Sequence, residues 1–188
     1  MVTLRTAQPE DTREVAEVWQ AAWHDGHRGH VPDALIEARD PAYFEARSGE
    51  LVDHITVAVG GDELLGVLIV KADELQQLMV TAAARGRGVG GLLLTEAERQ
   101  VAAAGHDEIW LAVVPGNTVA RRFYESHGWA DRGEETYDAV TLSGGSVPVP
   151  VRRYVKGLTS SSQQLTWPVG DDGPLTAPPA RWPRAGRR

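Results

Sequence analysis

The sequence of 188 residues contains no cysteine. Disulfide bonds, thiolate-bound metals and a cysteine nucleophile are therefore excluded. No apolar run approaches the roughly 20 residues that a membrane-spanning helix needs, and no signal-peptide pattern precedes Val2. From these absences we expect a cytoplasmic protein that has no membrane partner.

Positive charge is also in short supply. Lys and Arg number 19 against 26 Asp and Glu, which gives a net charge of −7. Residues 159–188 carry four arginines and two aspartates, a balance of +2, so residues 1–158 carry −9. An acidic body of this kind argues against nucleic acid as a partner. It is compatible with a cationic substrate such as an amine, although solubility alone would explain it equally well.

The composition changes near residue 159. Hydrophobic residues make up 42% of the chain, which is ordinary for a globular protein, and the length favours one domain. We assign that domain to residues 1–158. Residues 159–188 are rich in proline, serine and arginine, and we predict a disordered tail. Trp167 and Trp182 argue against complete disorder of this tail, because either could dock on the domain or on a second subunit.

One stretch combines a strand, a glycine-rich turn and a helix. A strand-like run over Glu74–Val80 leads into RGRGVGG at residues 85–91. A helical apolar face follows at Val89, Leu92, Leu93, Ala97 and Val101. A glycine-rich turn at a helix N-terminus presents backbone N–H groups at the positive end of the helix dipole, where phosphate binds. Since Arg85 and Arg87 add positive charge, the stretch predicts a pyrophosphate cradle.

The glycines of this turn fit two different motifs. Gly86, Gly88 and Gly91 match the dinucleotide pattern G-x-G-x-x-G, and an acidic pair at 107–108 lies about 20 residues on. A ribose-binding acid should end the second strand, whereas this pair precedes the predicted strand at 109–113. A nucleotide-binding oxidoreductase is therefore disfavoured. The better phase is Arg85-x-x-Gly88-x-Gly90.

In this phase, and with Gln77-Leu-Met-Val80 before it, the turn resembles the cofactor motif of the GCN5-related N-acetyltransferases (GNAT), which cradle the pyrophosphate of acetyl-CoA. The segment Asn117-Thr-Val-Ala-Arg-Arg-Phe-Tyr-Glu-Ser-His-Gly-Trp129 is similar to a second family pattern. The resemblance extends over about residues 2–158. It implies an α/β (α+β) fold with a mixed central β-sheet and helices on both faces.

The resemblance also implies acetyl-CoA as co-substrate and assigns its contacts. Backbone amides of the turn would bind pyrophosphate, main-chain groups of the preceding strand would pair with pantetheine, and Asn117 would bond to it. Tyr124 would contact the cofactor and act as general acid at sulfur, with a buried structural tyrosine as the alternative. The complete cofactor-binding set is Leu78, Met79, Val80, Arg85, Gly86, Arg87, Gly88, Val89, Gly90, Gly91, Asn117 and Tyr124.

The general base stays open at this point. Glu74 lies eleven residues before Arg85, where some family members place a catalytic glutamate. A water chain with pocket histidines is an equal alternative, and Asp73 is a third. His24, Asp25 and His27 are candidates for the wall of the acceptor pocket. We expect no metal, because the glycines around these histidines argue against a helix that would align them.

Two further expectations concern packing. Val119 and Phe123, at i and i+4 of a helix capped by Asn117, are predicted to face the core. Strands are predicted at 134–142 and 152–155, and Pro148 and Pro150 indicate a loop or an edge between them.

The sequence favours an N-acetyltransferase that moves the acetyl group of acetyl-CoA directly to an amine. Alkyl ammonium groups have a pKa of about 10 and must lose a proton before attack. No Ser-His-Asp set is apparent, so a ternary complex is preferred to an acyl-enzyme. The alternative is a non-catalytic acyl-CoA-binding or interaction module on the same fold. The sequence does not name the acceptor, and a homodimer is possible.

Overall fold

The computed structural model describes residues 1–158, and the prediction for the tail at 159–188, with Trp167 and Trp182, lies outside the described residues. Seven strands form one sheet in the order β1-β2-β3-β4-β5-β7-β6. The strands are β1 (Val2–Thr6), β2 (Ile55–Gly60), β3 (Glu63–Lys71), β4 (Glu74–Val80), β5 (Glu108–Val113), β6 (Ala130–Val140) and β7 (Ser146–Gly157). Only β4 and β5 are parallel, so the sheet is mixed, as expected.

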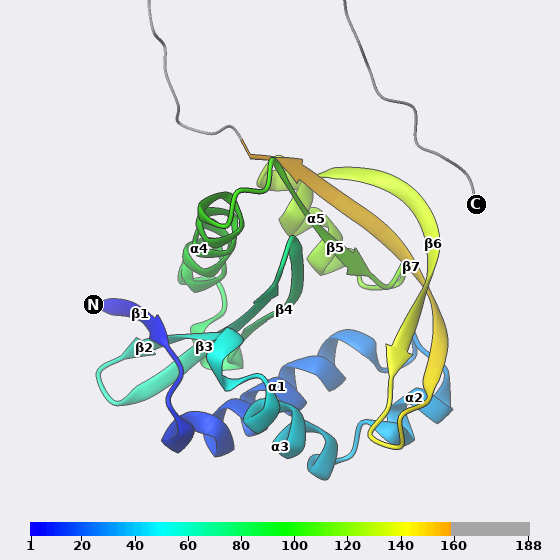
Figure 1. Cartoon of the computed structure of the whole chain (residues 1–188), viewed down its shortest axis with the longest axis horizontal. Coiled ribbons are helices and arrows are strands. Elements are labelled where there is room, and N and C mark those ends of the chain that lie inside the picture. Colours follow the sequence, from blue (N-terminus) through cyan, green and yellow to red (C-terminus); the bar gives the residue numbers. More distant parts are fainter. Residues whose placement is uncertain (159–188) are drawn as a thin grey trace, which may run out of the picture.

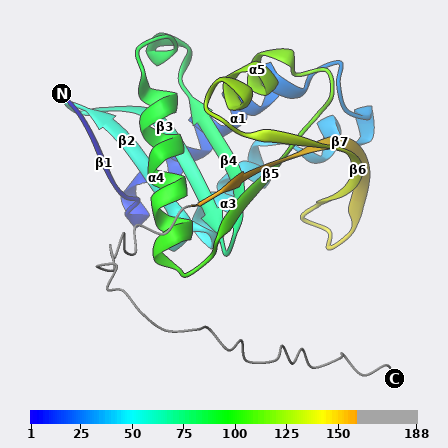
Figure 2. The ribbon, with the colours of Figure 1, turned by 90° about the horizontal axis from the view of Figure 1, so that it is seen from above.

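Helices cover both faces of this sheet (Figures 1 and 2). They are α1 (Thr12–His27), α2 (Asp33–Ala38), α3 (Pro41–Glu50), α4 (Val89–Ala103) and α5 (Thr118–Ser126). Strand β3 shows the two layers, because its side chains alternate between them. Val67 and Ile69 enter the core beneath α1 and α3, whereas Leu68 and Val70 enter the core beneath α4. The predicted helices on both faces are confirmed. Within residues 1–158 no helix is long and apolar enough to cross a membrane.

Strands β4 and β5 touch at one end only. Their sole paired position joins Glu74 to Trp110. The register between β3 and β4 passes from Val70 opposite Leu75 to Ile69 opposite Gln77, so Gln76 forms a β-bulge. Beyond the Glu74–Trp110 pair, β4 and β5 diverge toward their carboxyl ends. The edge of β4 that faces β5 is thus left without a neighbouring strand over most of its length.

Helix α1 contains His24 and His27, contrary to the sequence-based expectation, whereas His30 lies in a turn beyond it. Helix α1 continues through Gly26 and ends only at His27. A Cβ atom at Gly26 would lie 2.9 Å from the Asn117 side-chain nitrogen. Glycine costs helix propensity at this site but permits close approach of α1 to the turn before α5. Tertiary contact has overridden the local preference.

Two predicted apolar faces are partly wrong. On α4, Leu92 is 48% exposed and Leu94 takes its place in the core. On α5, Val119 is 79% exposed, contrary to the prediction that it faces the core, and the buried residue of this helix is Tyr124. The apolar pair Val119 and Phe123 instead lines a cleft described below. An apolar helix face can pack against a ligand cavity as well as against a core, and the sequence pattern does not distinguish the two.

The last two strands are longer than predicted, and Pro148 and Pro150 lie inside β7 rather than in a loop. Their positions pair with β6 alone, because β5 pairs only with residues 152–157 of β7. Proline lacks an N–H group and is tolerated where one side of a strand has no neighbour. The edge alternative is therefore correct.

Candidate active site

A cleft of about 690 Å³ opens where β4 and β5 diverge. Residues 75–80 of β4 and residues 111–114 at the end of β5 form its walls. The glycine turn, the last turn of α1 and one face of α5 complete it. Most of the predicted cofactor-binding residues meet in this one cleft: Leu78, Met79, Val80, Arg85, Gly86, Gly88, Gly90, Gly91, Asn117 and Tyr124. Of that set, Arg87 is exposed outside the cleft and Val89 is buried in the core.

The glycine turn has the geometry of an anion site. Gly86 and Gly88 have φ of 73° and 83°, a backbone conformation that other residues rarely adopt. Gly88 is the N-cap of α4, and no side chain caps this helix end. The first-turn N–H groups therefore point toward the cleft mouth without side-chain partners. Combined with the helix dipole, they favour a phosphate group.

Arg85 ties the glycine turn to α1. Its guanidinium lies 2.8 Å from the carboxylate of Asp25, and both side chains are at least half exposed. An exposed pair of this kind contributes about 0–1 kcal/mol and is easily exchanged for another anion. The arginine is thus available at the cleft mouth, next to the N-terminus of α4.

Tyr124 is the buried phenol of the cleft. Its ring packs among Phe123, Trp129 and Tyr154, with centroids 5.3 Å, 5.7 Å and 6.3 Å away. Burial raises the pKa of this phenol well above its ordinary value. Within residues 1–158 its hydroxyl makes no hydrogen bond. The site therefore holds a neutral hydroxyl whose proton is free for a ligand.

Glu74 lies beside the cleft, at the end of β4 that pairs with β5. Its two carboxylate oxygens accept hydrogen bonds from the Gln76 amide at 3.0 Å and from the Tyr137 hydroxyl at 3.1 Å. No cation among residues 1–158 forms an ion pair with it. Glu74 is not itself part of the cleft wall, but its neighbours Leu75 and Gln76 are.

Tyr137 was not found by the sequence analysis. It belongs to β6, 63 residues after its partner Glu74, and carries no local motif. Burial and the charge of Glu74 raise the pKa of this phenol to about 12. It therefore stays protonated and keeps donating to the carboxylate.

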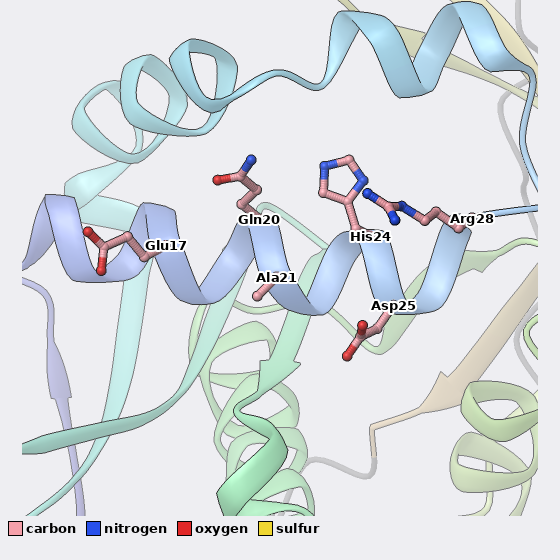
Figure 3. Close-up of a pocket in the computed structure, with 6 residues that line it drawn as sticks. All are labelled: Glu17, Gln20, Ala21, His24, Asp25 and Arg28. Atoms are coloured by element: carbon pink, nitrogen blue, oxygen red, sulfur yellow. The ribbon is translucent and has the colours of Figure 1, made fainter.

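The three residues predicted for the acceptor wall are separated by the helix that carries them. Figure 3 shows that His24 and Asp25 project to different sides of α1. His24 lines a second cavity of about 590 Å³ together with Glu17, Gln20, Ala21, Asp25 and Arg28. Of the three, only Asp25 and His27 line the cleft between β4 and β5.

His27 has a fixed orientation. Its ring stacks on Trp23 with centroids 4.4 Å apart, and its Nδ1 lies 2.8 Å from the Trp23 carbonyl oxygen. Because a carbonyl only accepts, Nδ1 carries the proton and Nε2 is left as an acceptor. Burial lowers the pKa of His27 to about 4, so the ring is neutral at physiological pH. Among residues 1–158, no group of three or more His, Cys, Asp or Glu could hold a metal ion.

Several solved structures share the fold of this chain. The structure of a GCN5-related N-acetyltransferase from Rhodopseudomonas palustris is 22% identical, with a TM-score of 0.66 over 83% of this chain and 95% of that one. The PaiA N-acetyltransferase from Thermoplasma acidophilum, in complex with coenzyme A, is 20% identical, with a TM-score of 0.63 over 84% and 99%. YncA from Salmonella typhimurium, with its cofactor acetyl-CoA, is 16% identical, with a TM-score of 0.59 over 89% and 99%. At these identities the likeness shows the fold alone.

The comparison with curated proteins gives no match. The sequence model of the acetyltransferase (GNAT) family, in contrast, matches residues 12–129, which is more than half of the chain. That match spans α1, the glycine turn, Asn117 and Tyr124, the elements that build the cleft. The chain therefore belongs to the GNAT family of acetyltransferases.

Proposed function

We propose that residues 1–158 transfer the acetyl group of acetyl-CoA directly to an amine acceptor, within a ternary complex. The observation that carries the proposal is the single cleft between β4 and β5. It unites a glycine turn, an open strand edge and a buried phenol that lie up to about 50 residues apart in the sequence. Two of the similar structures contain coenzyme A or acetyl-CoA. The cytoplasmic location and a homodimer stay predictions.

The residues present fit the cofactor along the whole cleft. The N–H groups of the glycine turn would hold the pyrophosphate, with Arg85 beside them. The free edge of β4 offers unpaired N–H and C=O groups to the amide groups of pantetheine, as an added strand would use them. The side-chain oxygen of Asn117 accepts a hydrogen bond from the N–H of Ala120, so its NH₂ group is the part left to bind a ligand.

Tyr124 would stabilise the departing thiolate. When the amine attacks, a C–N bond forms, the C–S bond breaks, and sulfur keeps the electron pair. A thiol has a pKa of about 8.5, far below that of the buried phenol, so complete proton transfer from Tyr124 is uphill. Its main contribution is a hydrogen bond that strengthens as charge develops on sulfur.

Glu74 would bind the amine acceptor and act as its general base. A carboxylate with neutral hydrogen-bond donors and no paired cation can attract an ammonium group and accept its proton, directly or through water. His27 lines the cleft, and its neutral Nε2 acceptor can hold such a water. The proton then leaves toward solvent, and the neutral amine attacks the carbonyl carbon.

The proposal is tested by binding and turnover together. Calorimetry should show CoA binding, and a panel of amines should release thiol from acetyl-CoA. Initial rates at several concentrations of both substrates should give intersecting reciprocal plots, as a ternary complex requires. Parallel plots would indicate an acyl-enzyme. CoA binding without thiol release for any amine would instead support a non-catalytic module.

A further inference from the structure

Arg39 is a buried cation that has no counter-ion among the described residues. It follows α2 and is only 8% exposed. Among residues 1–158 it forms no ion pair, and its Nη1 has no hydrogen-bond partner. Its guanidinium lies over two aromatic rings, with Cζ 3.7 Å from the centroid of Tyr43 and 5.8 Å from that of Trp23.

Aromatic stacking does not compensate the burial of this charge. Removing a cation from water costs several kcal/mol even in a relaxed protein, whereas a cation–π contact returns about 0.5–2 kcal/mol. Burial accordingly lowers the pKa of Arg39, although an arginine at this level remains charged. A guanidinium held this way is ready for an anion.

Arg39 packs against α1 and α3, and these two helices carry several buried donors without a partner in residues 1–158. The buried side-chain atoms without a hydrogen-bond partner in residues 1–158 are Trp19 Nε1, His24 Nδ1, Arg39 Nη1, Arg47 Nε and Ser48 Oγ. All lie on α1, on α3 or at Arg39 between α2 and α3, and each can donate a hydrogen bond. Burying so many donors without acceptors is costly. An oxyanion at Arg39 would supply the acceptor that Nη1 lacks.

Arg39 lies one aromatic ring behind the cleft wall, because its guanidinium is over Trp23 and the Trp23 ring stacks on His27, which lines the cleft. Tyr137 donates to Glu74 and lies close enough to Arg39 for the guanidinium to oppose the rise in its pKa. The charge of Arg39 also contributes to the low pKa of His27, which lines the cleft. A carboxylate and a guanidinium therefore flank one phenol, yet they form no ion pair with each other. The opposite charges are held apart.

We propose that the acceptor carries an anionic oxygen group, a carboxylate or a phosphate, in addition to its amine. Glu74 receives the ammonium end, and Arg39 receives the anionic end. This inference rests on the proposed acetyl transfer to an amine. It narrows the acceptor to amino acids, acidic amines and phosphorylated amines, and it excludes simple polyamines as preferred acceptors.

Matched acceptor pairs test the inference. Free α-amino acids are compared with their carboxamides, and phosphoethanolamine with ethanolamine, each with acetyl-CoA and thiol detection. Charge-assisted hydrogen bonds of this kind should favour the anionic member of the better pair by about 10- to 100-fold in kcat/KM. The pair that shows the preference identifies the anion.

The variant Arg39→Met supplies the second arm. It should remove the preference by raising KM for the anionic acceptor. Arg39→Lys should keep part of the preference, because it retains the charge but not the bidentate geometry. Arg13→Met, a change at an arginine side chain that is 88% exposed on α1, is the matched control and should change nothing.

Stability gives a readout that needs no acceptor. Without ligand, Arg39→Met in the full chain should raise Tm by a few degrees, since it removes an uncompensated buried charge. A fall in Tm, or neutral amines acetylated as well as their anionic partners, would overturn the inference. Failure to acetylate any amine while CoA still binds would overturn the proposed function instead, and the rise in Tm would then still report the uncompensated charge.

Discussion

Tyr124→Phe separates a catalytic hydroxyl from a structural one. The ring is 7% exposed and its packing survives the substitution, so the fold should persist. Because the hydroxyl has no partner among residues 1–158, its removal costs no hydrogen bond in the free protein. We therefore expect Tm to be unchanged or slightly raised.

In contrast to its Tm, the kcat of Tyr124→Phe should fall. General acid–base groups contribute about 10²–10⁴-fold, and the raised pKa of Tyr124 limits it to hydrogen bonding, so the lower end applies. A loss of about 100-fold in kcat corresponds to about 2.7 kcal/mol of transition-state stabilisation. The KM for acetyl-CoA should change little, since the interaction strengthens mainly as the thiolate departs.

Tyr154→Phe is the matched control in the same aromatic cluster. The Tyr154 hydroxyl donates to Glu125 at 2.7 Å and accepts from Arg121 at 3.2 Å, and its residue does not line the cleft. Losing these bonds should cost about 1–3 kcal/mol, or about 2–12 °C in Tm for a chain of this length. Its kcat should stay near the wild-type value.

Thermal melts and steady-state rates with the best acceptor of the amine panel measure both variants. Wild-type kcat in Tyr124→Phe, with chemistry shown to be rate-limiting, would refute the role at sulfur. An equal loss of CoA affinity would make Tyr124 a cofactor contact instead.

Four other outcomes are expected. Gly88→Val should weaken CoA binding by calorimetry at least 10-fold, because it strains a positive φ beside the phosphate site; unchanged affinity in a folded protein would exclude the cradle. Glu74→Gln should lower kcat with little change in CoA affinity, and equal turnover would transfer the base role to water held by His27. The pKa of His27 is about 4 in the folded protein and 6.5 in the unfolded chain, so the free energy of unfolding should fall by about 3 kcal/mol as pH drops from 6.5 to 4. His27→Gln should therefore lose less stability than the wild type between pH 7 and pH 4, and identical melting profiles would contradict the low pKa. Deleting residues 159–188 should leave Tm and CoA affinity unchanged, because both core clusters form within 1–158, and a drop of several degrees would show that the tail docks.

Expectations based on short-range geometry were the accurate ones. The turn from β4 to α4 follows from glycines that permit positive φ and from the helix that starts directly after them. Asn117 caps α5 as predicted, because a cap needs only the N–H three residues on. The family motifs lie in these segments. The fold and most of the cleft could therefore be predicted from the sequence.

Errors arose where distant segments meet. Gly26 stays helical because α1 passes close to Asn117, a contact 91 residues apart in the chain. Val119 faces a cleft instead of a core because β4 and β5 diverge beside it. Neither the periodicity of α5 nor the composition of α1 contains that information.

The sequence by itself determined the family and the glycine-rich turn, since the motifs that carry them consist of residues within a few positions of one another, and the mixed fold followed from the family. Only the tertiary structure brought Tyr137 to Glu74 and buried Arg39 without a counter-ion among residues 1–158. Hydrogen bonding and desolvation depend on which atoms are neighbours in space, and those neighbours come from β6, β4 and the segment between α2 and α3. The proposed acceptor end of the site therefore depends on packing, whereas the proposed cofactor end depends on local sequence.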